Sequence, residues 1–419
     1  MSSLEAQPAP VGGIRFLGQR RVYWRLLSRG AVLLVATLGI YRFWLNTDVR
    51  RYLWANTEVA GETLEYTGTP LELLLGFLVA VAILIPVYVG FFLAALDLGT
   101  LGQLSGVIAF FALGVLGQYA VFRARRYRLT RTIYRGLRFH QSGSAVLYAV
   151  RASLWWLLTA LTLGLAFPFQ TASLERYKMS HTFYGDLAGR FDGSGLRLFL
   201  RGLPMWVLVL APIGLTIGAF VEVIDWQALA TAAESGGDDV MAKIESGNPQ
   251  IADVFVFALL MLGTSVTFAA ILYPAYQALM LRWWSSGLRF GPIEMTSKLR
   301  TMQFYGAYVR FVWYAILFAI VAAIIGGIGL VTAGYFVGGE QTSIGGELAG
   351  TAILLGGYVI IALGFSTVYR ATVMLSLWKL GMESLQLSGL SALEQVAASG
   401  HASSPVGEGL ADALNAGGY

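Results

Sequence analysis

The chain has 419 residues, of which 56% are hydrophobic and only 13% charged, and its mean hydropathy is +0.65. A soluble protein carries about twice that charged fraction, so the composition excludes an ordinary soluble domain and indicates a polytopic membrane protein. The net charge of +5 fits basic loops beside anionic lipid rather than nucleic-acid binding. The absence of cysteine excludes disulfides, thiolate metal sites and cysteine nucleophiles.

Membrane helices are expected in a series of apolar segments, at residues 22–45, 71–96, 101–122, 145–169, 203–224, 251–281, 305–337 and 347–377. Six of these segments form three hairpins whose outer turns are short of basic residues, whereas the loops between the hairpins are rich in arginine. Basic loops stay inside, so the hairpins are expected to open toward the cytoplasm. The predicted fold class is an all-α polytopic membrane protein with six to eight crossings.

Segments 22–45 and 145–169 do not fit this pattern, because each has basic residues at both ends. Either the charge rule is violated locally, or each segment enters the membrane and returns on the same side. The uncharged core of the first, residues 30–41, has only 12 residues and is too short for an untilted crossing. Gly39 and Gly164 can supply the bend that the second interpretation requires.

A duplicated unit is visible in the sequence itself. Thr37-Leu38-Gly39, Arg51-Tyr52, Thr57 and Gly68 recur 125 positions later as Thr162-Leu163-Gly164, Arg176-Tyr177, Thr182 and Gly193. We therefore predict a first membrane unit at 1–135, a second at 136–286, a degenerate third unit or helical hairpin at 287–382, and a soluble tail at 383–419.

Short β-ribbons are predicted between the helices. The linkers at 57–69 and 182–194 are rich in β-prone residues around a glycine, and each is typical of a short hairpin or ribbon. Gly136-Leu137-Arg138-Phe139 and Gly287-Leu288-Arg289-Phe290 form a second recurrent motif, with a near copy at 13–16. Isolated ribbons are marginal in water, so we expect these pieces to pair with one another or to lie on the membrane surface, on its cytoplasmic side.

Several of these strings together resemble domain-of-unknown-function family 898, the YjgN-like bacterial inner-membrane proteins. The matching pieces include Thr37-Leu38-Gly39-Ile40-Tyr41, Arg50-Arg51-Tyr52, Asn56-Thr57, Glu65-Tyr66-Thr67-Gly68-Thr69, Ser180-His181-Thr182 and, in the tail, Gly407-Glu408-Gly409-Leu410-Ala411-Asp412. Asn56 departs from the histidine that the family tends to carry there. The resemblance implies a multi-pass protein of the bacterial inner membrane, and it supplies no catalytic residues.

Two sets of residues are candidate sites. A paired anion or lipid-headgroup site, one in each unit, is predicted at Arg50, Arg51, Tyr52, Arg176, Tyr177 and Lys178, because arginine suits phosphate and carboxylate contacts. The alternative for this set is topology and lipid anchoring only. A repeat interface or cavity is predicted at Thr37, Gly39, Asn56, Thr162, Gly164 and His181. We predict no catalytic, cofactor-binding or metal-binding residues and no cofactor.

Two functions follow as hypotheses. The first is transport or permeation of a small solute or ion, which requires a water-accessible cavity lined from both units near Thr37 and Thr162. The second is a non-transporting envelope protein that binds lipid headgroups or organises partners. An enzyme is not predicted, since no nucleophile–base pair or metal cluster is apparent. The expected partner is the lipid bilayer, with its anionic headgroups, and the tail is expected in the cytoplasm. The sequence gives no oligomeric state.

Overall fold

The computed structural model describes residues 12–96, 100–235, 246–337, 344–399 and 412. The outer turns of the three predicted hairpins, near 97–99, 236–245 and 338–343, and most of the tail beyond residue 399 lie outside them. The chain forms two compact units, Met1–Gly195 with Leu281–Tyr419, and Leu196–Met280. The predicted boundaries at 135, 286 and 382 follow the sequence repeat and stay a prediction.

Helices make up most of the described chain. They are α1 (Arg20–Ala36), α2 (Arg42–Ala55), α3 (Pro70–Ala95), α4 (Thr100–Thr130), α5 (Ala145–Leu161), α6 (Phe167–Ser180), α7 (Gly195–Val223), α8 (Trp226–Ser235), α10 (Ile251–Gly287), α11 (Thr301–Val337), α12 (Ile344–Tyr369), the π-helical turn η1 (Arg370–Met374) and α13 (Leu375–Glu383). Capping hydrogen bonds and backbone preferences determine where these helices begin and end. Thr69, for example, accepts a hydrogen bond from the backbone of Glu72 at the start of α3, and Pro70 occupies the first turn.

Six helices in the described part are long and apolar enough to cross a membrane. They are Pro70–Ala95, Leu104–Thr130, Gly195–Val223, Ile251–Gly287, Thr301–Tyr335 and Gly345–Glu383. Much of their surface is exposed apolar side chains, as lipid-facing helices require. These helices agree with the predicted polytopic membrane protein, and their number is the lower end of the predicted range.

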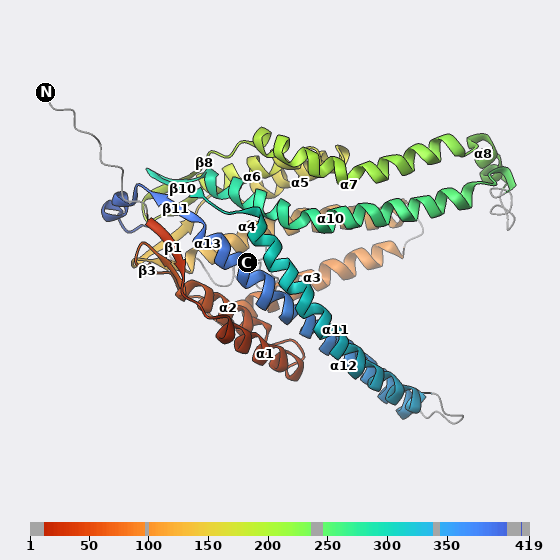
Figure 1. Cartoon of the computed structure of the whole chain (residues 1–419), viewed down its shortest axis with the longest axis horizontal. Coiled ribbons are helices and arrows are strands. Elements are labelled where there is room, and N and C mark those ends of the chain that lie inside the picture. The colour runs from red at the N-terminus through yellow and green to blue at the C-terminus, as the bar shows by residue number, and fades with distance from the viewer. Residues whose placement is uncertain (1–11, 97–99, 236–245, 338–343, 400–411, 413–419) are drawn as a thin grey trace. The chain divides into compact units, whose positions relative to one another are not determined.

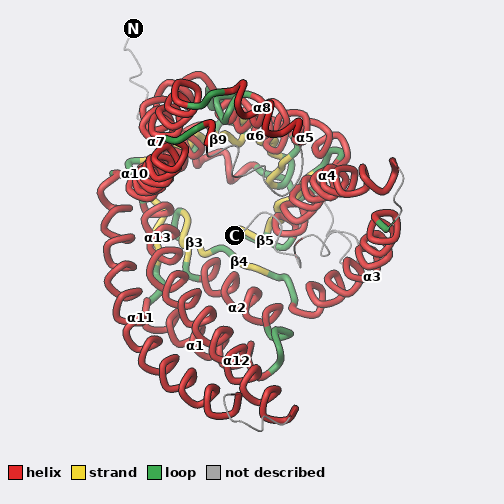
Figure 2. The backbone as a smooth tube through the Cα atoms, turned by 90° about the vertical axis from the view of Figure 1, so that its right-hand side faces the viewer, coloured by secondary structure: helices red, strands yellow, loops and turns green. Residues whose placement is uncertain are grey.

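The two segments with basic residues at both ends each form a helix, a turn and a second helix. In the first, α1 and α2 are joined through Leu38 and Gly39, which have φ of 50° and 90°. In the second, α5 and α6 are joined through Leu163 and Gly164, with φ of 49° and 91°. Backbone in this left-handed region ends a helix and favours glycine. The bend is therefore at the glycines that the sequence indicated, and α1, α2 and α12 lie side by side (Figure 2).

All the strands of the described chain join one antiparallel sheet. They are β1 (Gly12–Phe16), β2 (Thr57–Val59), β3 (Glu62–Thr63), β4 (Glu65–Tyr66), β5 (Thr132–Tyr134), β6 (Leu137–Gln141), β7 (Thr182–Tyr184), β8 (Leu187–Phe191), β9 (Leu288–Phe290), β10 (Ile293–Ser297) and β11 (Leu385–Ser388). The spatial order is β3-β2-β1-β11-β10-β9-β8-β7-β6-β5-β4. Only Leu64 separates the edge strands β3 and β4 in the chain. The two edges of the sheet therefore lie close together, and the sheet forms a nearly closed ring.

This ring modifies the predicted fold. The ribbons at 57–69 and 182–194 pair with strands formed by the Gly-Leu-Arg-Phe motifs: Phe16 faces Thr57, and Phe139 faces Tyr184. The predicted all-α fold with separate short ribbons therefore underestimates the β structure. Short ribbons are only marginally stable alone, and they become more stable when their edge strands pair with one another. Figure 1 shows several of the strands gathered at one end of their unit.

The start of the tail packs against apolar side chains of the ring. The interior of an eight-stranded barrel is just filled by its own side chains, so a ring of eleven strands has space for a further segment of the chain. The 3₁₀ helix η2 (Leu390–Gln395) supplies it: Leu390 and Leu393 pack against a cluster that includes Ile14 and Leu387. A cavity of about 180 Å³, lined only by apolar and aromatic side chains of the ring and η2, remains beside them.

Unit Leu196–Met280 is simpler. It contains nearly all of α7, the short helix α8 and the first part of α10. The hydroxyl of Ser265 donates to the backbone carbonyl of Val209, at 2.6 Å, and so ties α10 to α7 in a largely apolar pair of helices. Asn248 orders the start of α10 and accepts a hydrogen bond from the backbone N–H of Asp225, at 2.7 Å.

Candidate functional site

The most buried charges of the described chain form a cluster next to the ring. The guanidinium of Arg50 on α2 binds both carboxylate oxygens of Asp412, and both side chains are almost fully buried. Arg50 also donates to the hydroxyl of Tyr66, at 3.1 Å, and Arg128 on α4 lies 3.8 Å from Asp412. Two arginines thus surround one carboxylate that belongs to the tail.

Electrostatics explains why this buried cluster is stable. Burial by itself lowers the pKa of Arg50, but the charge of Asp412 and the contact with Tyr66 outweigh burial, and the net effect raises that pKa. Arg50 therefore remains a cation in the interior. Burial also raises the pKa of Tyr66, which keeps its phenol neutral and able to accept a hydrogen bond. The two-point contact of Arg50 with this carboxylate has the planar geometry that arginine forms with two-oxygen anions.

A second buried network lies at the start of α3. Glu72 receives a two-point contact from Arg131, with distances of 3.1 Å and 2.9 Å, and a hydrogen bond of 2.7 Å from the Tyr127 hydroxyl. Its charge is therefore satisfied within the protein. Because all its partners come from α4 and the following residue, the network fixes how the first hairpin meets the ring.

The matched position of Arg50 in the second stretch is Glu175, which reverses the sign of the charge. Glu175 pairs with Lys178 and accepts a hydrogen bond of 3.2 Å from the Trp284 indole. Burial, reinforced by Arg125, lowers the pKa of Lys178 even though Glu175 opposes this shift. Arg125 donates to the Thr182 hydroxyl at 2.9 Å. In the second stretch the matched position therefore holds a carboxylate paired with Lys178, where the first stretch has the Arg50 guanidinium.

The predicted anion residues make mainly internal contacts. Arg51 donates to the carbonyl of Gly68 at 2.9 Å, and Arg176 donates to the carbonyl of Gly193 at 3.2 Å. Their tyrosine neighbours behave alike: the hydroxyl of Tyr52 donates to Gln19 O at 2.7 Å, and that of Tyr177 to Ser144 O at 2.9 Å. Of the predicted set, Arg50 is brought together with a second arginine, Arg128, around the carboxylate of Asp412.

The predicted cavity residues also serve the local backbone. Thr37 donates to Leu33 O and accepts from the backbone of Tyr41, and Thr162 does the same with Leu158 and Ala166. Asn56 donates to the Tyr52 carbonyl, whereas His181 Nδ1 lies 2.7 Å from the Tyr177 carbonyl. Gly39 and Gly164 form the bends described above. The predicted two-sided cavity stays a prediction.

Sequence reasoning missed a recess of about 220 Å³ between α1, α2 and the junction of α12 with η1. We call it the arginine recess; its lining residues are Leu27, Ala31, Leu34, Arg42, Leu45, Asn46, Leu363, Ser366, Thr367 and Arg370. One part of its wall is apolar and the other carries two guanidinium groups, an amide and two hydroxyls. In the sequence, Arg42 and Arg370 each lie at the end of an apolar segment. They are 328 positions apart, so no local pattern indicates that they line the same recess.

Aromatic rings and the helix backbone position the two arginines. The guanidinium of Arg42 lies 4.8 Å and 4.5 Å from the ring centroids of Phe43 and Phe77. Burial lowers the pKa of Arg42, which means that its charge has lost part of its hydration. Arg370 begins the π-helical turn η1, a helix irregularity that is frequent at functional sites. Together these features place a partly dehydrated Arg42 and a second cation, Arg370, beside an apolar wall.

Comparison with known proteins identifies the family. The family model described as "Bacterial protein of unknown function (DUF898)" matches residues 12–413. The chain therefore belongs to this family, as the resemblance of its motifs predicted. No curated protein and no solved structure matches the chain. The match runs from β1 to Asp412 and so includes the ring, the Arg50 cradle and both arginines of the recess.

Proposed function

We propose that this member of the DUF898 family binds an anionic lipid headgroup in the arginine recess, and that it does so as a multi-pass protein of the bacterial inner membrane. The observation that carries this function is the presence of Arg42 and Arg370 on one small recess that also has an apolar wall. Arginine forms planar two-point contacts with phosphate, and Asn46 and Ser366 offer further hydrogen bonds.

The position of the recess supports a lipid rather than a soluble ligand. Arg370 lies inside the membrane-length helix Gly345–Glu383, and Arg42 directly follows the apolar bend of the first segment. Long basic side chains at the ends of apolar helices reach the headgroup level of a bilayer. A recess of about 220 Å³ is smaller than most sites for whole ligands, and so it suits a headgroup whose acyl chains remain in the bilayer.

The orientation follows from the charge pattern. The basic loops lead into the strands, so we infer that the ring, the two bent segments and the C-terminal tail lie on the cytoplasmic side. We also infer that the stretches around α1–α2 and α5–α6 are copies of one unit, because their bends, strand registers and Arg–Gly contacts correspond. Of the two copies, the first lines the arginine recess, together with α12 and η1. We therefore infer that the two copies have different roles.

The test is lipid binding by the purified protein. We expect phosphatidylglycerol to raise the thermal unfolding midpoint of delipidated protein in neutral detergent, since a ligand of the native state stabilises it. The variant with both Arg42→Gln and Arg370→Gln should lose at least about tenfold in affinity, in keeping with two lost charge-assisted contacts. Arg29→Gln is the matched control, because Arg29 is an exposed arginine on α1 outside the recess.

Two results would contradict headgroup binding. One is equal phosphatidylglycerol affinity in the double variant and the wild type. The other is equal protection of the wild type by inorganic phosphate at the same concentration, which would identify a soluble anion as the ligand.

Transport of a small anion is the second candidate function. The observation in its favour is the π-helical turn Arg370–Met374 within a helix of membrane-spanning length, since broken helices with a charged residue often line solute pathways. Liposomes containing the protein should then show anion flux that Arg370→Gln abolishes. Absence of flux together with intact lipid binding would leave the headgroup function alone.

A further inference from the structure

A second, larger and much more apolar site lies between α4 and α5. We call it the α4–α5 groove; its volume is about 630 Å³, and the residues used below are Phe110, Gly114, Gln118, Ser153, Trp156 and Leu157. This volume falls within the range of about 300–1,000 Å³ that is typical of ligand sites. The rings of Phe110 and Trp156, with centroids 5.9 Å apart, line it together. Its walls are separate from the arginine recess.

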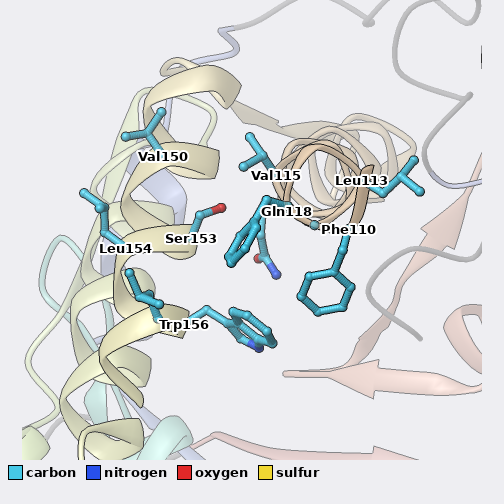
Figure 3. Close-up of a pocket in the computed structure, with 11 residues that line it drawn as sticks. Phe110, Leu113, Val115, Gln118, Val150, Ser153, Leu154 and Trp156 are labelled. Atoms are coloured by element: carbon cyan, nitrogen blue, oxygen red, sulfur yellow. The ribbon is translucent and has the colours of Figure 1, made fainter. Parts of the chain in front are cut away.

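Two polar side chains enter this apolar surface. Figure 3 shows the amide of Gln118, from α4, and the hydroxyl of Ser153, from α5, turned toward the space between the helices. Within the described residues the Ser153 hydroxyl has no hydrogen-bond partner, although it is screened from water. A polar group held in apolar surroundings without a partner costs free energy. The groove therefore fits a ligand that is mostly apolar and that brings a hydrogen-bonding group of its own.

The depth of these side chains indicates which ligand this is. Gln118 lies in the membrane-length helix Leu104–Thr130, five residues on the apolar side of Arg123, which is about 7.5 Å along a helix. On α5, the exposed Arg151 precedes Ser153 by two residues. Basic residues mark the headgroup level. The polar pair is therefore just below that level, where the ester groups of a phospholipid join its acyl chains.

We propose that the α4–α5 groove binds one acyl chain of a glycerophospholipid, whose ester carbonyl accepts a hydrogen bond from the Gln118 amide. The acyl chain runs along Phe110, Trp156 and Leu157. Arg151, two residues before Ser153 on α5, lies on the headgroup side. The site recognises the ester linkage and the chain, whereas the arginine recess recognises negative charge, so this inference does not depend on the proposed function.

The experiment compares lipids that differ only at the linkage. Delipidated protein in neutral detergent is titrated with diacyl phosphatidylethanolamine or with its dialkyl-ether analogue, and bound lipid is counted by native mass spectrometry. We expect the ester lipid to bind about threefold to tenfold more tightly, as one hydrogen bond implies. Gln118→Leu should remove this preference and retain binding of the ether lipid. Equal affinity of the wild type for both lipids would overturn the assigned role of Gln118.

A second pair of variants tests the groove itself. Gly114 lines the groove, and the Cβ that a substitution adds there meets no other atom within 4 Å, so Gly114→Phe is designed to place a bulky ring in the groove. We expect this variant to lose both lipids. Gly90→Phe in α3 is the matched control, because Gly90 is equally open and outside the groove. Lipid binding that is the same in Gly114→Phe and Gly90→Phe would refute the groove as the site.

Discussion

At the scale of single residues, the ion pair of Arg50 with Asp412 joins positions that are 362 residues apart. We expect Asp412→Ala to lower the free energy of unfolding by roughly 3–5 kcal/mol, because it leaves a buried cation without its counter-charge. The measurement is denaturant or thermal unfolding of the purified protein in neutral detergent. Arg128 also lies near Asp412, so removal of the carboxylate leaves two guanidinium groups to repel each other.

The partner variant separates this charge effect from a loss of packing. Replacing both residues, with Arg50→Met and Asp412→Leu, should be clearly less destabilising than Asp412→Ala alone, since it removes the unpaired charge as well. Unchanged stability of Asp412→Ala would show that the tail carboxylate does not hold the folded state together.

At the scale of elements, the bends at Gly39 and Gly164 decide whether two apolar segments cross or return. Nothing lies close to the Cβ that a substitution would add at Gly39, so the cost of Gly39→Ala is conformational. We expect a loss of about 1–2 kcal/mol, because the residue has a φ of +90°. Gly90→Ala, in a regular helix, should instead gain up to about 1 kcal/mol. Similar unfolding midpoints for the two variants would contradict the bend.

The tips of these bends also carry exposed apolar side chains. Leu38 is 94% exposed and Leu163 is 72% exposed, although both are leucines in the left-handed region. A leucine in that conformation is strained, and burial inside the protein does not repay the strain. Both tips are therefore suited to contact with lipid, which agrees with bent segments that enter the membrane from one side.

At the scale of the whole molecule, the natural absence of cysteine allows the topology to be tested directly. Single cysteines at Arg20, Asn56 and His181 should react with a membrane-impermeant thiol reagent from the same, cytoplasmic side. Trp226→Cys, just after the span Gly195–Val223, should react from the opposite side. If positions 20 and 56 reacted from opposite sides, α1 and α2 would have to cross the membrane, and the bent interpretation would fail.

Much of the architecture could be read from residue patterns, because it depends on local chemistry. Long uncharged runs mark the six candidate spans, and Thr-Leu-Gly strings mark the two bends. The candidate sites were less predictable. Arg51 and Arg176 have the sequence pattern expected of anion-binding residues. In the structure their guanidinium groups donate hydrogen bonds to the backbone carbonyls of Gly68 and Gly193. The sequence indicates which arginines lie near a membrane surface. It does not show which of them form hydrogen bonds or ion pairs within the protein.

The sequence by itself determined the membrane class, the family, the bends and the strand-forming motifs, since each follows from hydropathy, charge and backbone preference over a few neighbouring residues. Only the tertiary structure decided that the strands form one nearly closed ring on which the start of the tail packs, and that Asp412 rather than an external ligand occupies the Arg50 cradle. It also brought Arg42 and Arg370 to one recess. These contacts join residues hundreds of positions apart, and their energy comes from burial and charge pairing, which no local pattern records.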